Sequence, residues 1–135
     1  MPLSTTDRLD ILDLAARYSH ATDHGDGEAL AATFTADGVF DGPGGPRQGR
    51  AAHVEATNAL GASGMVLRHF ISNAVIEGDG DAATMQLYVE VKNLADLATP
   101  MLIGRYHDEL RRVDGRWLFA RRRVEVDYPS ASAPS

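Results

Sequence analysis

A chain of 135 residues is long enough to bury one sizeable core and to shape a pocket, but it is too short for two independent cores. Its 44% hydrophobic and 24% charged residues argue against a disordered or membrane-embedded chain, and the absence of cysteine excludes disulfides, thiolate catalysis and cysteine-based zinc sites. A formal net charge of −6 disfavours nucleic acid as a partner, because polyanions are held by dense positive charge.

The first segment predicts an amphipathic helix over residues 4–24, because apolar side chains recur on one arc at helical spacing. Ser4 followed by Asp7 has the spacing of a capping box, and Gly25 is expected to end the helix. Residues 1–4 contain no apolar signal core, and no apolar run approaches the roughly 20 residues that span a bilayer. We therefore expect a cytoplasmic protein without a membrane partner.

Two shorter helices are predicted next. Asp26 is expected to cap a helix of roughly residues 28–35, which Asp37 and Gly38 would end. A segment rich in glycine and proline at residues 39–49 surrounds a short strand, and residues 50–60 return to an alanine-rich helical pattern. Three helices thus precede the main strands.

After Gly64 the periodicity changes to two, which predicts strands. Asp114 and Gly115 form a strong hairpin signal between the last two of them. Helices followed by an antiparallel meander indicate an α+β domain over residues 1–128, in which one curved sheet wraps the helices, with a disordered tail at 129–135. The four predicted strands are residues 65–77, 83–94, 101–113 and 116–128.

Strand 83–94 has one wholly apolar face, whereas neither face of strand 65–77 is plainly polar. A sheet that covers helices on one side and is apolar on the other must hide its second side, and self-association does so. We therefore predict a homodimer through the outer face, with Gln86, Tyr88 and Glu90 pointing inward beside His69. The predicted dimer face consists of Phe70, Met85, Leu87, Val89 and Val91.

Asp23 and His69 are the main candidates for chemistry. Asp23 lies at the margin of the apolar arc of the first helix, and His69 lies mid-strand, where its ring needs a hydrogen-bond partner. An Asp–His pair would hold one tautomer and stabilise the imidazolium that forms when the other nitrogen takes a proton. A solvated helix-end acid and a core histidine are the alternatives that stay open.

Three further side chains could contribute. Tyr18 lies within the apolar arc, so its ring is expected in the core and its hydroxyl could serve the site. Arg122 is the favoured inward-facing cation of residues 121–123, and it either faces the pocket or pairs with an acid on the adjacent strand. Gly104 shares a face with Tyr106, and its missing side chain either leaves room for a ligand or marks a bend.

His20, Asp23 and His24 have the spacing of metal ligands on one helix. Both histidines point away from the apolar arc, and no second helix offers matching ligands. We therefore predict no metal.

Six short motifs then occur in order along the chain. Together they resemble the SnoaL-like branch of the nuclear-transport-factor-2-like superfamily over residues 5–128, which implies a cone-shaped fold. The motifs are Tyr18-x-x-Ala21-x-Asp23-x-Gly25-Asp26, Phe34-x-x-Asp37-Gly38, Gly49-Arg50, His69-x-x-x-Asn73, Gly104-x-Tyr106-x-Asp108 and Asp114-Gly115-x-Trp117.

Within that branch the chain is similar to scytalone dehydratase, bile acid 7α-dehydratase and hexachlorocyclohexane dehydrochlorinase. The resemblance implies a cofactor-free β-elimination or isomerisation of a small apolar polycyclic, polyketide or terpenoid molecule. His69 would abstract a proton, Asp23 would orient and stabilise it, and Tyr18 or Arg122 would assist the leaving group or an oxyanion. Some dehydratases have a tyrosine at position 40, so their exact substrate is not implied. The expected substrate contacts are Phe40, Asn73, Tyr88, Glu90, Gly104 and Tyr106.

Two other functions stay open at this point. A polyketide cyclase of the SnoaL type would use acidic residues for aldol chemistry. A non-catalytic module like the small subunit of ring-hydroxylating dioxygenases would need no Asp–His pair.

Overall fold

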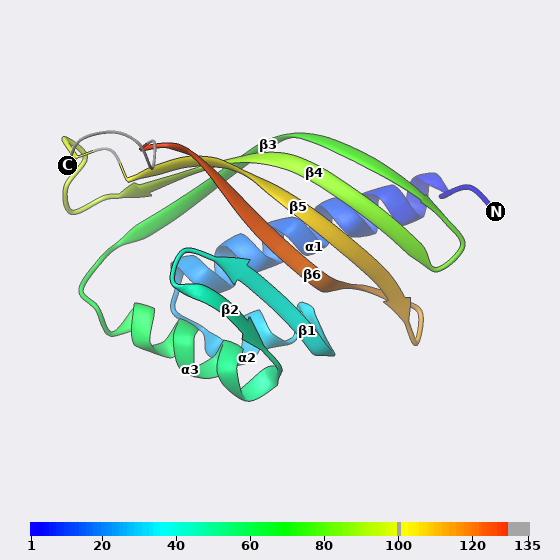
Figure 1. Cartoon of the computed structure of the whole chain (residues 1–135), viewed down its shortest axis with the longest axis horizontal. Helices are drawn as coiled ribbons and strands as arrows, with labels where there is room; N and C mark the ends of the chain where they lie inside the picture. The colour runs from blue at the N-terminus through cyan, green and yellow to red at the C-terminus, as the bar shows by residue number, and fades with distance from the viewer. Residues whose placement is uncertain (100, 130–135) are drawn as a thin grey trace.

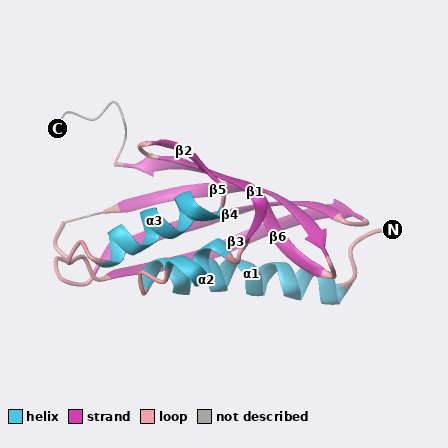
Figure 2. Cartoon of the chain, turned by 90° about the horizontal axis from the view of Figure 1, so that it is seen from below, coloured by secondary structure: helices cyan, strands magenta, loops and turns pink. Residues whose placement is uncertain are grey.

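The computed structural model describes residues 1–99 and 101–129 and has the α+β architecture expected from the sequence. Figure 1 shows the long strands arching over the helices, and Figure 2 shows the helices from below. Apart from Pro129, the tail expected at residues 129–135 lies outside the described residues. The elements are α1 (Thr5–Asp23), α2 (Gly27–Ala31), β1 (Phe34–Gly42), β2 (Gly45–Gln48), α3 (Arg50–Gly61), β3 (Leu67–Asp79), β4 (Ala82–Asn93), β5 (Leu102–Val113) and β6 (Arg116–Tyr128).

The sheet has six strands in the order β2-β1-β6-β5-β4-β3. The four strands β3 to β6 form the predicted antiparallel meander. β1 adds to it by pairing in parallel with β6, and β2 pairs in antiparallel with β1 at the edge. The segment predicted as one short strand therefore supplies a hairpin that widens the curved sheet.

The second helix is shorter than predicted, because residues 34 and 35 belong to the sheet. α2 ends at Ala31, and Phe34 opens β1 in register with Phe119 of β6. The backbone N–H of Phe119 donates to the Thr33 carbonyl over 2.8 Å, and the ring of Phe34 is buried. Long-range pairing and burial thus outweigh the helical pattern of residues 28–35.

The predicted ends of α1 are confirmed. The Ser4 hydroxyl accepts a hydrogen bond from the Asp7 N–H, and the Asp7 carboxylate accepts one from the Ser4 N–H, each over 3.0 Å. At the other end Gly25 has φ +64°, a conformation that favours glycine. A Cβ at Gly25 would lie 2.5 Å from the Cα of Gly61, so glycine also lets α1 approach α3 closely.

The predicted faces of β4 are wrong. Its apolar face is buried toward the helices, and the strand register places Val91 beside His69 on that same inner face. The sequence offered no register between the two strands, and the face that removes more apolar area from water is the one that covers the helices. The predicted dimer face does not exist as a surface, because four of its members are core residues: Met85, Leu87, Val89 and Val91.

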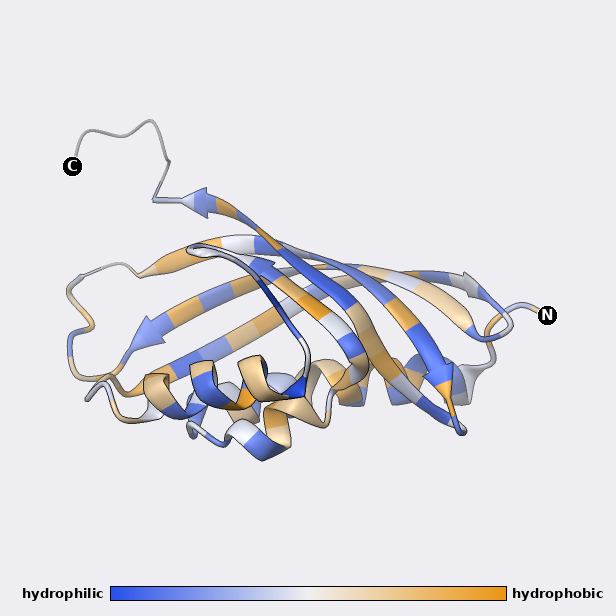
Figure 3. Cartoon of the chain, turned by 60° about the horizontal axis from the view of Figure 1, so that its bottom comes forward, coloured by the Kyte–Doolittle hydropathy of each residue, from blue (hydrophilic) through white to orange (hydrophobic). Residues whose placement is uncertain are grey.

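Alternating hydropathy along the long strands agrees with one covered and one open face (Figure 3). β3 departs from simple alternation, because a bulge between Ser72 and Val75 shifts its register against β4. After the bulge Ile76 packs against the core, whereas Val75 is exposed. None of the helices in the described part of the chain is long and apolar enough to cross a membrane.

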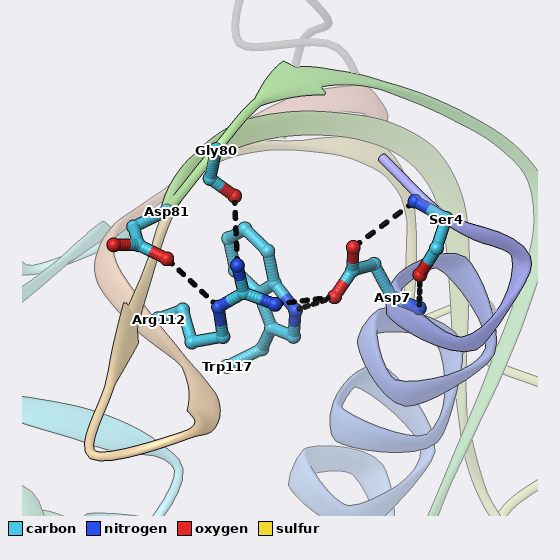
Figure 4. A network of polar contacts seen from close by, with 6 residues as sticks. All are labelled: Ser4, Asp7, Gly80, Asp81, Arg112 and Trp117. Atoms are coloured by element: carbon cyan, nitrogen blue, oxygen red, sulfur yellow. Dashed lines mark hydrogen bonds and ion pairs between the residues drawn. The ribbon is translucent and has the colours of Figure 1, made fainter. Parts of the chain in front are cut away.

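A polar network ties α1 to the β5–β6 hairpin (Figure 4). One Asp7 oxygen accepts hydrogen bonds from Arg112 over 2.8 Å and from the Trp117 indole N–H over 3.1 Å. Arg112 also donates to Asp81 over 2.8 Å. The hydrogen bond from the Ser4 backbone, followed by that from Trp117, lowers the pKa of Asp7 below its ordinary value.

This network predicts a pH-dependent part of the stability. An acid whose pKa is lowered by folding adds stability above its unfolded pKa of about 3.9, and the gain is lost as pH falls through the folded value. Asp7→Asn should therefore lower the melting temperature at pH 7 and make it less sensitive to acidification between about pH 5 and pH 2. Thermal unfolding across this range would measure both effects. Asp10→Asn, at an exposed position of the same helix, is the control, and identical curves for all three proteins would contradict the assignment.

Candidate active site

Asp23 and His69 meet inside the curved sheet, one from the last turn of α1 and one from β3. Asp23 Oδ1 lies 2.5 Å from His69 Nδ1, and Asp23 Oδ2 accepts the backbone N–H of His69 over 3.0 Å. The two side chains are only 7% and 9% exposed. The carboxylate therefore contacts the ring and the main chain of the same residue, which fixes the ring relative to β3.

This geometry selects one form of the imidazole. A carboxylate can only accept, so Nδ1 carries the proton that it donates to Asp23, and Nε2 is left with a lone pair. Nε2 has no hydrogen-bond partner among residues 1–99 and 101–129. The ring is thus arranged to accept a proton at Nε2 while the adjacent carboxylate stabilises the resulting cation.

A cluster of aromatic rings surrounds Arg122 deeper in the interior. The guanidinium carbon lies 4.4 Å from the ring centre of Tyr18, 3.6 Å from that of Tyr106 and 4.2 Å from that of Phe119. Burial raises the pKa of Tyr18 and raises that of Tyr106 more strongly. At neutral pH both phenols therefore stay protonated, and each can donate a hydrogen bond but cannot act as a base.

Arg122 is fully buried and pairs with Asp108 of the adjacent strand β5. Its Nε and Nη2 donate to the two Asp108 oxygens over 2.8 and 3.0 Å. Burial raises the pKa of Asp108, and Arg122 opposes part of that rise. Arg122 faces the interior as predicted, and the ion pair weighed as its alternative role is present. Its Nη1 is buried and has no hydrogen-bond partner among the described residues, so a further role for Arg122 at the site stays a prediction.

The structure adds Arg47 and His53, which the sequence analysis did not single out. His53 of α3 is fully buried, and its Nε2 lies 3.0 Å from the Gly38 carbonyl. Its Nδ1 accepts a hydrogen bond from Arg47 Nε over 3.1 Å. Arg47 in turn lies over the Phe40 ring at 4.4 Å, and the Phe40 and Tyr18 rings stack with centres 6.3 Å apart.

Three predicted substrate contacts lie outside the interior. Tyr88 is 52% exposed on the outer face, and Glu90 is on that face too, because β4 presents its apolar side to the helices. Asn73 is exposed on the edge strand at φ +58°, where the β3 bulge breaks the alternation that placed it beside His69. Their assignment to the site is therefore wrong.

Tyr106 and Gly104 lie on the inner face as predicted, but Gly104 leaves no room for a ligand. A Cβ there would lie 2.5 Å from the Glu125 carbonyl oxygen, which indicates a bend in the sheet.

The sequence carries a simple signal for the partner of Arg122 and for that of Arg47. Asp108, the partner of Arg122, follows Tyr106 by two residues and so lies on the same strand face. His53, the partner of Arg47, shares one buried helix face with Thr57.

A surface groove lies elsewhere, along the outer side of α1 beside α2 and the β5–β6 turn. It encloses about 630 Å³, and both His20 and His24 line it. Asp23 turns to His69 instead, so the three side chains weighed as metal ligands do not converge. No group of three or more His, Asp or Glu residues in the described ranges is arranged to hold a metal ion.

The Arg122–Asp108 pair predicts a non-additive effect on stability. Arg122→Met or Asp108→Leu alone leaves an uncompensated buried charge and should lower the free energy of unfolding by about 3–5 kcal/mol. The double variant should lose clearly less than the sum of the two. Urea unfolding measures all three, and the exposed pair Arg121–Asp41 is the control, with a coupling below about 1 kcal/mol. Additive losses at Arg122 and Asp108 would contradict this prediction.

Comparison with known proteins agrees with this fold. The sequence profile of the SnoaL-like domain family matches residues 4–123. No curated protein matches the chain. Among solved structures, a Nostoc punctiforme protein of unknown function with a cystatin-like fold is 34% identical, with 97% of this chain and 98% of that chain covered and a TM-score of 0.87.

Two structures from Novosphingobium aromaticivorans are also similar. An NTF2-like protein with a cystatin-like fold is 30% identical over 95% of this chain and 86% of that one, with a TM-score of 0.80. A protein provisionally named a scytalone dehydratase is 25% identical over 90% of this chain and 84% of that one, with a TM-score of 0.78. The chain therefore belongs to the SnoaL-like domain family, which confirms the resemblance seen in the sequence motifs.

Proposed function

We propose that this protein is a cofactor-independent lyase or isomerase that uses Asp23 and His69 as an acid–base pair. The observation that carries the proposal is the nearly buried 2.5 Å contact between Asp23 Oδ1 and His69 Nδ1, which leaves Nε2 able to accept a proton. The relative provisionally named a scytalone dehydratase supports the same class of reaction.

In the proposed elimination, His69 Nε2 takes a proton from a substrate carbon beside an activating group. The electron pair of the broken C–H bond forms a C=C bond, and the leaving group departs from the next carbon with its bonding pair. The imidazolium proton then passes to the departing hydroxide and gives water. In an isomerisation the same proton would return to another carbon, so neither route needs a cofactor.

Asp23 stabilises the imidazolium throughout, because its charge lies against Nδ1. Tyr18 is the proposed hydrogen-bond donor to an oxyanion, since burial keeps its hydroxyl protonated. Arg122 acts indirectly in this scheme, because Asp108 holds its guanidinium against the Tyr18 and Tyr106 rings. The dyad therefore does the proton transfer, and the aromatic cluster shapes the interior.

The substrate is proposed to be small and largely apolar. Leu102 lies in register with Val91, which itself lies in register with His69, so aliphatic side chains adjoin the imidazole. Ile71 follows on the same face and packs against the core. An SnoaL-type cyclase would act on similar molecules, and identifying the product would separate the two reactions. A cytoplasmic location remains a prediction from the sequence.

The dyad predicts specific kinetic effects on the substrate once it is identified. His69→Ala removes the proton acceptor and should lower turnover by roughly 10²–10⁴-fold. Asp23→Asn should also impair turnover, because an amide keeps a hydrogen bond but cannot stabilise the imidazolium charge. Steady-state kinetics alongside thermal unfolding would measure these losses.

His107→Ala provides the matched control. His107 is also a strand histidine bonded to a carboxylate, with 2.9 Å between its Nε2 and Glu125, but it lies on the outer face. This variant should keep turnover within about twofold, well inside the loss expected for a general base. Near-wild-type turnover in a folded His69→Ala protein would end the acid–base proposal.

We also propose that the chain forms a homodimer, through an outer face different from the one predicted. Phe70, Tyr88, Ile103 and Tyr128 are each about half exposed there. Phe70, Tyr88 and Ile103 border a hollow of about 400 Å³ whose rim includes Arg105. Apolar side chains gathered on an open sheet favour a second copy as their cover.

The dimer is tested by sedimentation at micromolar concentration. Wild type should sediment as a dimer, and Phe70→Glu should shift it to monomer, because a buried unpaired charge opposes association. Leu9→Glu is the control, since Leu9 is exposed on α1 away from the sheet. A wild-type monomer, or dissociation by Leu9→Glu alone, would contradict the proposed face.

A further inference from the structure

We propose that Arg47, held in place by His53, binds a carboxylate of the substrate, so that the substrate is an acid carried on an apolar ring system. This inference rests on the proposed function, because it extends the same interior to a second binding point. The sequence analysis instead favoured Arg122 as the inward-facing cation of the site.

Arg47 lies on the inner face of the sheet. It is in register with Phe40 of β1, and Phe40 is in register with Arg122 of β6, so the three side chains share one face. The Arg47 guanidinium carbon lies 4.4 Å from the Phe40 ring centre, and its side chain is half-buried. The cation is thus on the concave side and still in contact with solvent.

His53 fixes the direction of this guanidinium. Because a carbonyl can only accept, the 3.0 Å contact with Gly38 requires the proton on His53 Nε2. Nδ1 is then a pure acceptor, and it receives Arg47 Nε. Burial lowers the pKa of His53, which favours this neutral ring. Arg47 is therefore oriented by an uncharged group and keeps its full positive charge.

The charges on the inner face make Arg47 distinctive. Arg122 is neutralised by Asp108, and Arg112 pairs with Asp7 and Asp81. Arg47 forms no ion pair among the described residues, and its two terminal nitrogens have no hydrogen-bond partner there. A guanidinium with both terminal N–H groups available matches a carboxylate in bidentate geometry.

Aromatic rings connect Arg47 to the rest of the interior. Phe40 stacks on Tyr18, and the Tyr18 ring meets that of Tyr106 at 5.9 Å. The positive charge of Arg47 also reaches the Tyr18 hydroxyl, since it opposes the rise of the Tyr18 pKa. Tyr18 and Tyr106 are buried, whereas Phe40 is only half-buried, so an apolar ring lying against Phe40 would bring its acid group to Arg47.

The overall charge of −6 does not prevent this binding. Salt screens exposed charges beyond about 8 Å at physiological ionic strength, whereas a contact at Arg47 is direct. Because the surroundings are acidic on balance, an acid ligand needs such a local cation. The inference is therefore specific to one side chain.

The test compares 2-naphthoate with 2-naphthamide, which has the same ring and no charge, by isothermal titration calorimetry on the full chain. Wild type should bind the naphthoate saturably and at least about tenfold more tightly than the amide, as expected for a charge-assisted pair. Arg47→Met should remove this preference and leave the amide affinity unchanged. Arg47→Lys should keep part of it, because the charge remains but the bidentate geometry is lost.

Arg123→Met is the matched control, since Arg123 is an exposed outer-face arginine, and it should leave the preference intact. His53→Gln should preserve the preference, because its amide can donate to Gly38 and accept from Arg47, whereas His53→Leu should weaken it. Equal affinity for the two probes in wild type, absence of saturable naphthoate binding, or an unchanged preference in folded Arg47→Met would overturn the inference. His69→Ala should bind naphthoate normally, so failure of the acid–base proposal would appear in turnover alone.

Discussion

The burial of Arg122 is the constraint on which the interior depends. A guanidinium removed from water costs several kcal/mol unless it is paired, and here Asp108 and three aromatic rings supply the compensation. These partners come from α1, β5 and β6, so satisfying one charge fixes a helix against two strands. The same arrangement holds the Tyr18 and Tyr106 rings against the cation. The centre of the domain is therefore specified by charge geometry as well as by apolar packing.

The Arg122–Asp108 pair stabilises the interior, while other polar groups remain available for chemistry. Arg122 is neutralised, but its buried Nη1 has no hydrogen-bond partner among the described residues. Nearer the margins of the interior, His69 Nε2 and the terminal nitrogens of Arg47 also have unused hydrogen-bonding capacity. One is arranged to accept a proton, and the other is a cation without a carboxylate partner among the described residues. The two differ in what orients them: a carboxylate polarises His69, whereas a neutral imidazole orients Arg47 without reducing its charge.

The fold explains how a small chain can hold such groups partly shielded from bulk water. The curved sheet covers α1 with one face, and the β1–β2 hairpin extends that face until α3 packs against it through His53. Members of the SnoaL-like family share this frame, and the chemistry depends on which side chains project inward from it. In this chain those side chains come from α1, α3 and strands at both edges of the sheet.

The sequence by itself determined both ends of α1, the meander of four strands, the family and the candidates Asp23 and His69. These depend on local signals: Ser4 with Asp7, Gly25, and alternation along each strand. Tertiary structure decided what local signals cannot contain. Strand register placed Val91 beside His69 and turned Tyr88 and Glu90 outward, and a bulge removed Asn73 from the inner face. Pairing across distant segments gave Arg122 to Asp108 and Arg47 to His53, because the cost of burying a charge is settled only by the partner that folding brings within hydrogen-bonding distance.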